Sequence, residues 1–64
     1  MKLNIKKIKR ELLVQGLNYA KLGRKMGVSR QAVEQYMANP ESMTFKTLTK
    51  IAKTLELDPK DLLI

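Results

Sequence analysis

The stretch Leu17–Met37, LNYAKLGRKMGVSRQAVEQYM, decides the fold of this chain because it reads as two short helices joined by a tight turn. In its first half, three apolar side chains lie at the spacing of one helix face: Tyr19, Leu22 and Met26. Gly27 follows, and glycine adopts the left-handed conformation that ends a helix without steric cost. Ser29 is a favourable helix cap, so a second helix is predicted over about residues 30–37.

The second of these helices has one apolar face and one polar face. The apolar face predicted to be buried consists of Val33, Tyr36 and Met37. Gln31 and Gln35 point away from that face, and Arg30 lies in the first turn. A short polar helix that is held by a rigid turn is suited to reading base edges in the DNA major groove.

A capping pattern recurs along the chain: an apolar residue, a capping residue, and a second apolar residue four positions after the cap. This is the hydrophobic staple, which sets the angle at which the chain enters a helix. It occurs at Leu3-Asn4…Ile8, Leu17-Asn18…Leu22, Val28-Ser29…Val33, Met43-Thr44…Leu48 and Leu57-Asp58…Leu62. The pattern predicts five helices, and Asn39-Pro40 predicts a loop over residues 38–43.

The first, fourth and fifth predicted helices lie outside the central stretch. The first is expected over about 5–14, with Ile5, Ile8 and Leu12 facing the core, and the fourth over about 45–55. The predicted buried stripe of the fourth consists of Phe45, Leu48, Ile51, Ala52 and Leu55. Asp58 caps the fifth, with Pro59 at its first position, and the apolar end Leu62–Ile64 is expected to be exposed.

The central stretch resembles the helix-turn-helix of the phage repressor and Cro family, which includes XRE-like bacterial regulators. The matching residues are Leu17, Asn18, Ala20, Leu22, Gly27, Val28, Ser29, Gln31, Val33, Glu34 and Gln35. Thr44–Leu63 resembles the family's fourth and fifth helices. The resemblance implies an all-α, five-helix, lambda-repressor-like DNA-binding domain over residues 1–64, with the helix-turn-helix at helices two and three. The family prefers alanine where Gly23 stands, since the helices cross closely there.

The resemblance also implies which residues contact bases. Those positions of the family correspond to Ser29, Arg30, Gln31 and Gln35. Arginine can bond bidentately to guanine and glutamine to adenine. For two of these residues an alternative to base contact remains open. The Ser29 hydroxyl can be occupied as a helix cap, and Gln35 can contact phosphate. Glu34 either holds Arg30 at the i, i+4 spacing, which we favour, or accepts a hydrogen bond from cytosine.

Phosphate contacts are expected at helix N-termini, whose free N–H groups bind anions. The candidates are Asn18 and Tyr19 at the start of helix two, and Thr44 and Lys46 at the start of helix four. The family often has glutamine where Tyr19 stands. The alternative for Tyr19 is therefore that its ring packs inward and presents only its hydroxyl.

One departure from the family affects the core. Phage members often place an arginine in helix one and a glutamate at the end of helix three as a partly buried ion pair. The corresponding residues here are Leu12 and Met37, so both partners are apolar. Replacing such a pair by packed apolar side chains is often neutral or stabilising.

The composition excludes several classes of function. The 64 residues contain no cysteine and no histidine, which removes disulfides, the usual zinc sites, nucleophilic triads and imidazole bases. The acidic residues form no recognisable catalytic pair, and there is no phosphate-binding glycine loop. We therefore expect no enzyme, no cofactor, no metal and no small-molecule ligand. No apolar run has membrane-spanning length, so the chain is expected to be cytoplasmic.

The charge is uneven along the chain. The net charge is +7, and residues 1–30 hold nine basic residues with Glu11 as their one acid. Residues 31–64 hold four basic and five acidic residues. One positive half indicates a face turned toward a polyanion, although a lysine-rich solvated surface would give the same numbers.

The sequence therefore predicts a sequence-specific binder of double-stranded DNA. The expected role is a transcriptional repressor that occupies a palindromic operator as a homodimer, with helix three in the major groove. The alternative is an antitoxin-like or adaptor module whose main partner is a protein. The apolar end Leu62–Ile64 supports that alternative, and the polar helix three argues against it as the only role.

Overall fold

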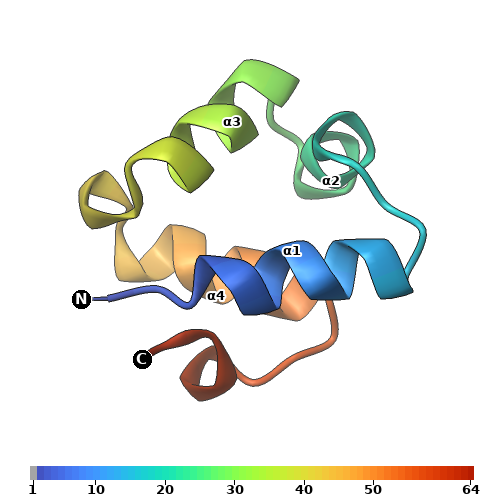
Figure 1. Ribbon diagram of the computed structural model, residues 1–64. Helices are drawn as coiled ribbons and strands as arrows, with labels where there is room; N and C mark the ends of the chain where they lie inside the picture. The colour runs from blue at the N-terminus through green and yellow to red at the C-terminus, as the bar shows by residue number, and fades with distance from the viewer. Residues whose placement is uncertain (1) are drawn as a thin grey trace.

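A computed structural model describes residues 2–64, which form four α-helices and two short 3-10 helices. The elements in chain order are α1 (Ile5–Val14), α2 (Tyr19–Met26), α3 (Arg30–Ala38), η1 (Pro40–Ser42), α4 (Phe45–Thr54) and η2 (Pro59–Leu62). In the view of Figure 1, α1 crosses in front of α4, α2 and α3 lie above them, and the η2 segment lies beneath. The predicted bounds of the first helix agree with this arrangement. The loop predicted over residues 38–43 is shorter than expected, because Ala38 is the last residue of α3 and Pro40–Ser42 forms η1.

All five predicted capping residues cap a helix. Each side-chain oxygen accepts a hydrogen bond from a backbone N–H in the first turn, which satisfies a donor that the helix leaves free. The bonds are Lys7 N to Asn4 at 3.2 Å, Lys21 N to Asn18 at 2.8 Å, Ala32 N to Ser29 at 3.1 Å, Thr47 N to Thr44 at 3.2 Å and Lys60 N to Asp58 at 3.0 Å. The capping pattern therefore located the starts of α1, α2, α3, α4 and η2 correctly. It did not locate the start of η1, where the Asn39 side chain makes no capping bond.

The fifth helix is not an α-helix, so the predicted count of five α-helices is wrong. Pro59–Leu62 forms one 3-10 turn, and Leu63 then adopts extended backbone. Leu63 pairs with Leu3 in an antiparallel bridge, in which Asn4 N donates to the Leu62 carbonyl (2.8 Å) and Ile64 N donates to the Lys2 carbonyl (3.1 Å). Because these backbone groups bond to the N-terminal segment, they cannot extend the helix.

Three helices end in the same way. After α1, α2 and α4, a residue with positive φ lets the next N–H reach back to a carbonyl in the last turn, as in a Schellman motif. The three residues are Gly16 (φ 68°), Gly27 (φ 75°) and Glu56 (φ 59°). The returning bonds run from Leu17 N to Leu12 O, Val28 N to Gly23 O and Leu57 N to Ala52 O, at 2.7, 2.8 and 2.8 Å. Glu56 is the one residue of the three that is not glycine, so its side chain is strained in this left-handed conformation.

Replacing Glu56 with glycine is expected to stabilise the fold by about 0.5–1 kcal/mol. A side chain in the left-handed region costs about 1–2 kcal/mol, and the extra flexibility of glycine in the unfolded chain offsets part of the gain. Thermal unfolding followed by circular dichroism measures the effect. Lys53→Gly, three residues earlier inside α4, is the matched control and should lower stability by about 1 kcal/mol. A lower melting temperature for Glu56→Gly would contradict the strain argument.

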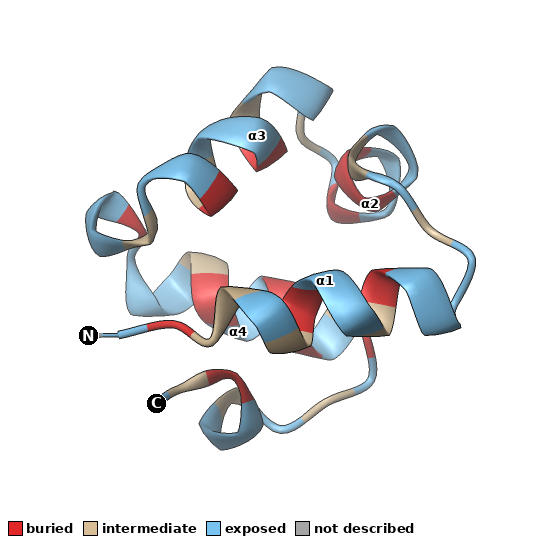
Figure 2. Ribbon diagram, in the orientation of Figure 1, coloured by how far each residue is buried: buried red, intermediate tan, exposed pale blue. Residues whose placement is uncertain are grey.

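The core lies where the helices meet (Figure 2). Its buried residues are all apolar, namely Leu3, Ile8, Leu12, Leu22, Met26, Val33, Met37, Met43, Leu48, Ile51, Ala52, Leu55 and Leu62. Ile5 is half-buried against this core, as predicted, and Leu12 and Met37 both belong to it. None of the helices in residues 2–64 is both long enough and apolar enough to cross a membrane.

Two predictions about apolar exposure are wrong. Phe45 was expected in the buried stripe of α4, but its side chain is 61% exposed because it lies in the first turn, one turn ahead of buried Leu48. The C-terminal apolar residues were expected to be exposed. Leu62 is fully buried instead, Leu63 is half-buried through its pairing with Leu3, and only Ile64 is largely exposed.

Candidate nucleic-acid interface

A close approach between α2 and the following turn holds α3 in place. A Cβ atom on Gly23 would lie 2.8 Å from the Val28 carbonyl oxygen, closer than real Cβ atoms pack, and at a tight 3.1 Å from the Ser29 carbonyl oxygen. The Val28 N–H also donates to the Gly23 carbonyl at 2.8 Å. Leu22 and Val33 are fully buried beneath this crossing. The predicted need for a small side chain at Gly23 is therefore confirmed, and the turn before α3 packs closely against α2.

The side chains of α3 divide into an outward face and a flank. At about 100° per residue, Gln31, Gln35 and Ala38 lie opposite the buried Val33 and Met37. Arg30 and Glu34 lie between these two sides, along one edge of the helix. All four polar side chains are exposed, so the outward face presents amide donors and acceptors to whatever lies against α3.

Ser29 is occupied as a helix cap, in agreement with that alternative. Its hydroxyl oxygen accepts the Ala32 N–H at 3.1 Å, and the residue is exposed at the tip of α3. The hydroxyl hydrogen remains a donor, because a cap uses only the oxygen. Ser29 can therefore donate a hydrogen bond without losing its capping role.

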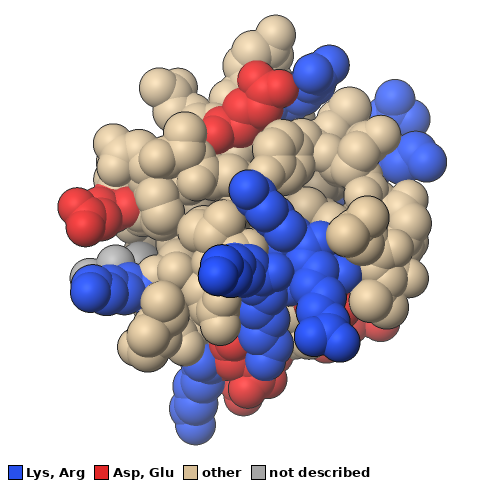
Figure 3. Space-filling model, in the orientation of Figure 1, with Lys and Arg blue, Asp and Glu red and all other residues tan. Residues whose placement is uncertain are grey.

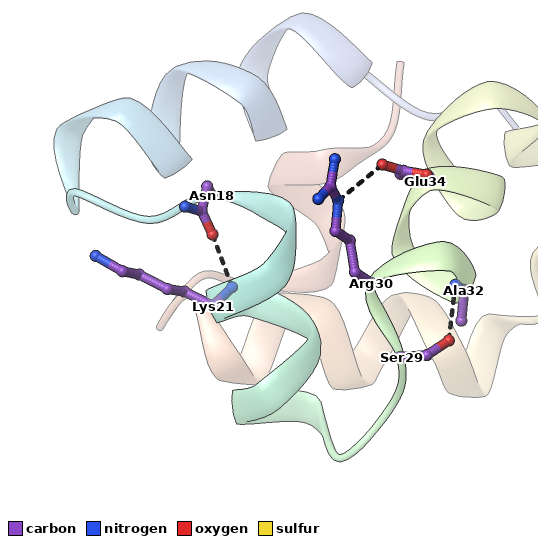
Figure 4. Close-up of polar contacts among 6 residues, drawn as sticks. All are labelled: Asn18, Lys21, Ser29, Arg30, Ala32 and Glu34. Atoms are coloured by element: carbon purple, nitrogen blue, oxygen red, sulfur yellow. Dashed lines mark hydrogen bonds and ion pairs between the residues drawn. The ribbon is translucent and has the colours of Figure 1, made fainter.

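Arg30 forms an ion pair with Glu34, as we favoured from the sequence. The guanidinium Nε donates to Glu34 Oε1 at 3.0 Å, one helical turn along α3. Figure 4 shows Arg30 reaching from the start of α3 back toward α1 and α2, with Glu34 meeting it from α3. The two side chains are 65% and 45% exposed, and exposed pairs at this spacing contribute only about 0.3–0.5 kcal/mol to stability. The ion pair therefore bears more on the orientation of the Arg30 side chain than on the stability of the fold.

A shallow groove brings several predicted site residues together. Its volume is about 460 Å³, and it is lined by Lys9, Leu12, Leu13, Leu17, Asn18, Tyr19, Ala20 and Arg30. One base-contact candidate, Arg30, thus lies beside two phosphate-contact candidates, Asn18 and Tyr19. Lys9 also lines the groove, although it was not among the predicted contacts. Its position four residues after core-facing Ile5, at the edge of the apolar stripe of α1, was the available signal.

The candidates at the start of α2 differ in what they can donate. The Asn18 side-chain oxygen accepts the Lys21 N–H at 2.8 Å, which leaves its NH₂ group free to face a phosphate (Figure 4). Tyr19 is half-buried against the core, as the alternative for this residue proposed, so its ring serves packing.

The candidates at the start of α4 lie outside the groove. Thr44 caps α4, and its hydroxyl also lies 3.1 Å from the Thr47 hydroxyl. Lys46 is exposed in the first turn of α4. The predicted phosphate contacts therefore belong to two separate helix N-termini, one at α2 and one at α4.

Basic side chains gather over α1 in the view of Figure 3. Lys6, Lys9 and Arg10 are exposed on this helix, and Lys9 lies at the edge of the groove. The face that contains Arg30 thus continues into a positive surface on α1, which favours contact with a polyanion. Among residues 2–64, no three acidic side chains come together in a cluster that could hold a metal ion.

A sequence model of the Cro/C1-type HTH DNA-binding domain family matches residues 7–64, which includes all four α-helices except the first two residues of α1. Neither a curated protein nor a solved structure matches the chain.

Proposed function

This chain belongs to the Cro/C1-type helix-turn-helix family of DNA-binding domains, and from that premise we propose that it is a cytoplasmic transcriptional repressor. In this proposal the whole chain acts as one DNA-binding domain. It binds a palindromic operator in double-stranded DNA as a homodimer, and α3 of each copy lies in the major groove.

The exposed polar face of α3 carries the proposal. Gln31 and Gln35 project from a helix whose other side is locked into the core through Val33 and Met37. A rigid helix that presents side-chain amides can bond two edge atoms of one base, and adenine N6 and N7 offer the matching donor and acceptor. Arg30 and Ser29 at the N-terminal tip complete the proposed set of base contacts.

Phosphate contacts are assigned to the two helix N-termini on either side of α3. Asn18 and Tyr19 would face one strand from the start of α2, and Thr44 and Lys46 would face the other from the start of α4. Backbone N–H groups at these ends supply donors in addition to the side chains. Such contacts fix the position of the protein on the duplex without reading its sequence.

Pairing on DNA follows from the small size of the domain, since one copy of α3 reads only a few base pairs. In related folds, two copies bind half-sites about one helical turn apart. Phe45 and Ile64 are large apolar side chains that stay exposed near α4 and the chain end, so we assign the contact between copies to this region. We expect a monomer or weak dimer in solution and a two-fold dimer on the operator.

Selection from random duplex DNA, followed by binding titrations on the selected sequence, tests the proposed function. The expected result is a palindromic consensus bound by two copies, as sedimentation of the complex would show. The logarithm of affinity should fall with the logarithm of salt concentration, with a slope of about −0.9 for each of roughly four to six phosphates per half-site. A single copy per operator would contradict the dimer, and binding without salt dependence would contradict the nucleic-acid function.

Arg30→Ala and Lys46→Ala should weaken binding in different ways. Loss of a bidentate contact to guanine is expected to cost about 1–3 kcal/mol per half-site and to relax the preference at one base pair. Loss of Lys46 should weaken binding to all sequences alike and reduce the salt slope by about one unit. Both side chains are exposed, so neither change should alter folding. Titrations on the operator and its single-base variants measure both effects. If Arg30→Ala lost affinity equally for every operator variant, Arg30 would contact phosphate and not a base.

A further inference from the structure

The ion pair on α3 engages one particular atom of Arg30. The bond to Glu34 uses Nε, at 3.0 Å, and not the two terminal Nη groups. A guanidinium has five N–H donors in a fixed fork, so engaging Nε leaves both Nη groups to donate together. Those two groups are spaced to donate in parallel to the O6 and N7 acceptors of guanine, and no other base presents two acceptors at that edge.

Without Glu34, Arg30 would have other anionic partners close by. Its side chain is long and 65% exposed, and it lines the same groove as Lys9, Asn18 and Tyr19. The proposed function places phosphates beside this groove. A free arginine here could turn toward a phosphate, which carries no sequence information. The carboxylate of Glu34 opposes that movement in two ways, because it bonds Nε and repels phosphate.

We propose that Glu34 is a positioning residue for DNA recognition that commits Arg30 to one guanine and away from the phosphate backbone. The proposal rests on the proposed function, since it needs α3 to lie in the major groove. Glu34 then raises specificity while lowering affinity for DNA in general. Removing a residue with only a structural role would not lower specificity while raising the general affinity for DNA.

The test compares Glu34→Ala with Glu41→Ala, which removes the same charge from the exposed turn η1 after α3. The preference for guanine at the base pair assigned to Arg30 should fall about twofold in Glu34→Ala, because an exposed ion pair at this spacing favours the oriented conformation of Arg30 by roughly that factor. Affinity for a duplex without the operator should rise. Glu41→Ala should leave the guanine preference unchanged. Adding Glu34→Ala to Arg30→Ala should give no further loss of preference, since Glu34 acts through Arg30.

Unchanged guanine preference in Glu34→Ala would overturn the proposal. So would a lost preference at a neighbouring cytosine that persists in the Arg30→Ala background, because Glu34 would then read a base itself. The NMR signal of the Arg30 Nε–H, recorded without DNA, gives an independent readout. It should exchange with water about twofold more slowly in the native protein than in Glu34→Ala, and equal exchange in both would also overturn the proposal. If the exchange of the Arg30 Nε–H depends on Glu34 but the native protein selects no sequence from random duplex DNA, the proposed function has failed and not the ion pair.

Discussion

Replacing Gly23 with valine is expected to unfold the protein. The added Cβ would lie 2.8 Å from the Val28 carbonyl oxygen and about as close to the backbone of Ser29, and the valine methyl groups would extend further. Backbone atoms in a tight turn cannot move aside as a flexible side chain can. Relief of the clash would have to separate α2 from α3, which would open the fully buried contact around Leu22 and Val33. A domain of this size has only about 5 kcal/mol of stability to lose.

Circular dichroism and thermal melting measure this result. Ala20→Val is the matched control, because Ala20 is exposed on the same helix and valine there should cost only about 0.5 kcal/mol of helix propensity. The melting temperature of Gly23→Ala should lie between those of Gly23→Val and Ala20→Val. Alanine meets the same backbone contact as valine, but it gains about 1 kcal/mol of helix propensity relative to glycine. A folded Gly23→Val protein with a native melting temperature would show that the turn is not held against α2.

Replacing Leu12 with arginine is expected to cost about 3–5 kcal/mol, because it places an unpaired charge inside the core. Leu12 is 4% exposed and Met37 is 8% exposed, and both belong to one apolar cluster. If these two side chains take the place of the family's arginine–glutamate pair, adding Met37→Glu should recover part of the loss. Leu13→Arg is the control, since Leu13 is 81% exposed and should tolerate the charge.

Thermal melts of the two single mutants and the double mutant provide the test as a double-mutant cycle. A double mutant more stable than Leu12→Arg alone would show that the positions interact. Losses that simply add would show that Leu12 and Met37 are buried in the same core without touching.

Local interactions explain which parts of the fold could be predicted from the sequence. A helix cap involves a side chain and an N–H three residues away, so the caps at Asn4 and Thr44 are visible in a short window of sequence. The same holds for the positive φ of Gly27, because glycine is the preferred residue there. Glu56 has the same conformation without the glycine, and so the end of α4 had no such signal.

Longer-range features could not be predicted in this way. The bridge between Leu3 and Leu63 consists of backbone hydrogen bonds, which leave no trace in side-chain identity. Periodicity correctly gave the direction of Leu48 around α4. It could not show that Phe45, at the first position of the same helix, is left largely exposed.

The candidate site was predictable to a similar extent. The positions of Gln31 and Gln35 on the exposed side of α3 follow from helix periodicity, and the spacing of Arg30 and Glu34 allows their ion pair. The place of Lys9 beside Arg30 depends on how α1 packs against the start of α2. That packing joins residues far apart in the chain, so it became visible only in the structure.

The bridge between the chain ends also bears on the order of folding. Helices α2 and α3 are joined by three residues and can meet as soon as they form, whereas Leu3 and Leu63 must close nearly the whole chain into a loop. Closing a longer loop costs more chain entropy, so the ends are expected to join after the main barrier has been crossed. Interactions that form after the barrier slow unfolding but do not speed folding. The residues at the bridge would then govern how long the native state lasts, while the crossing at Gly23 governs how fast it is reached.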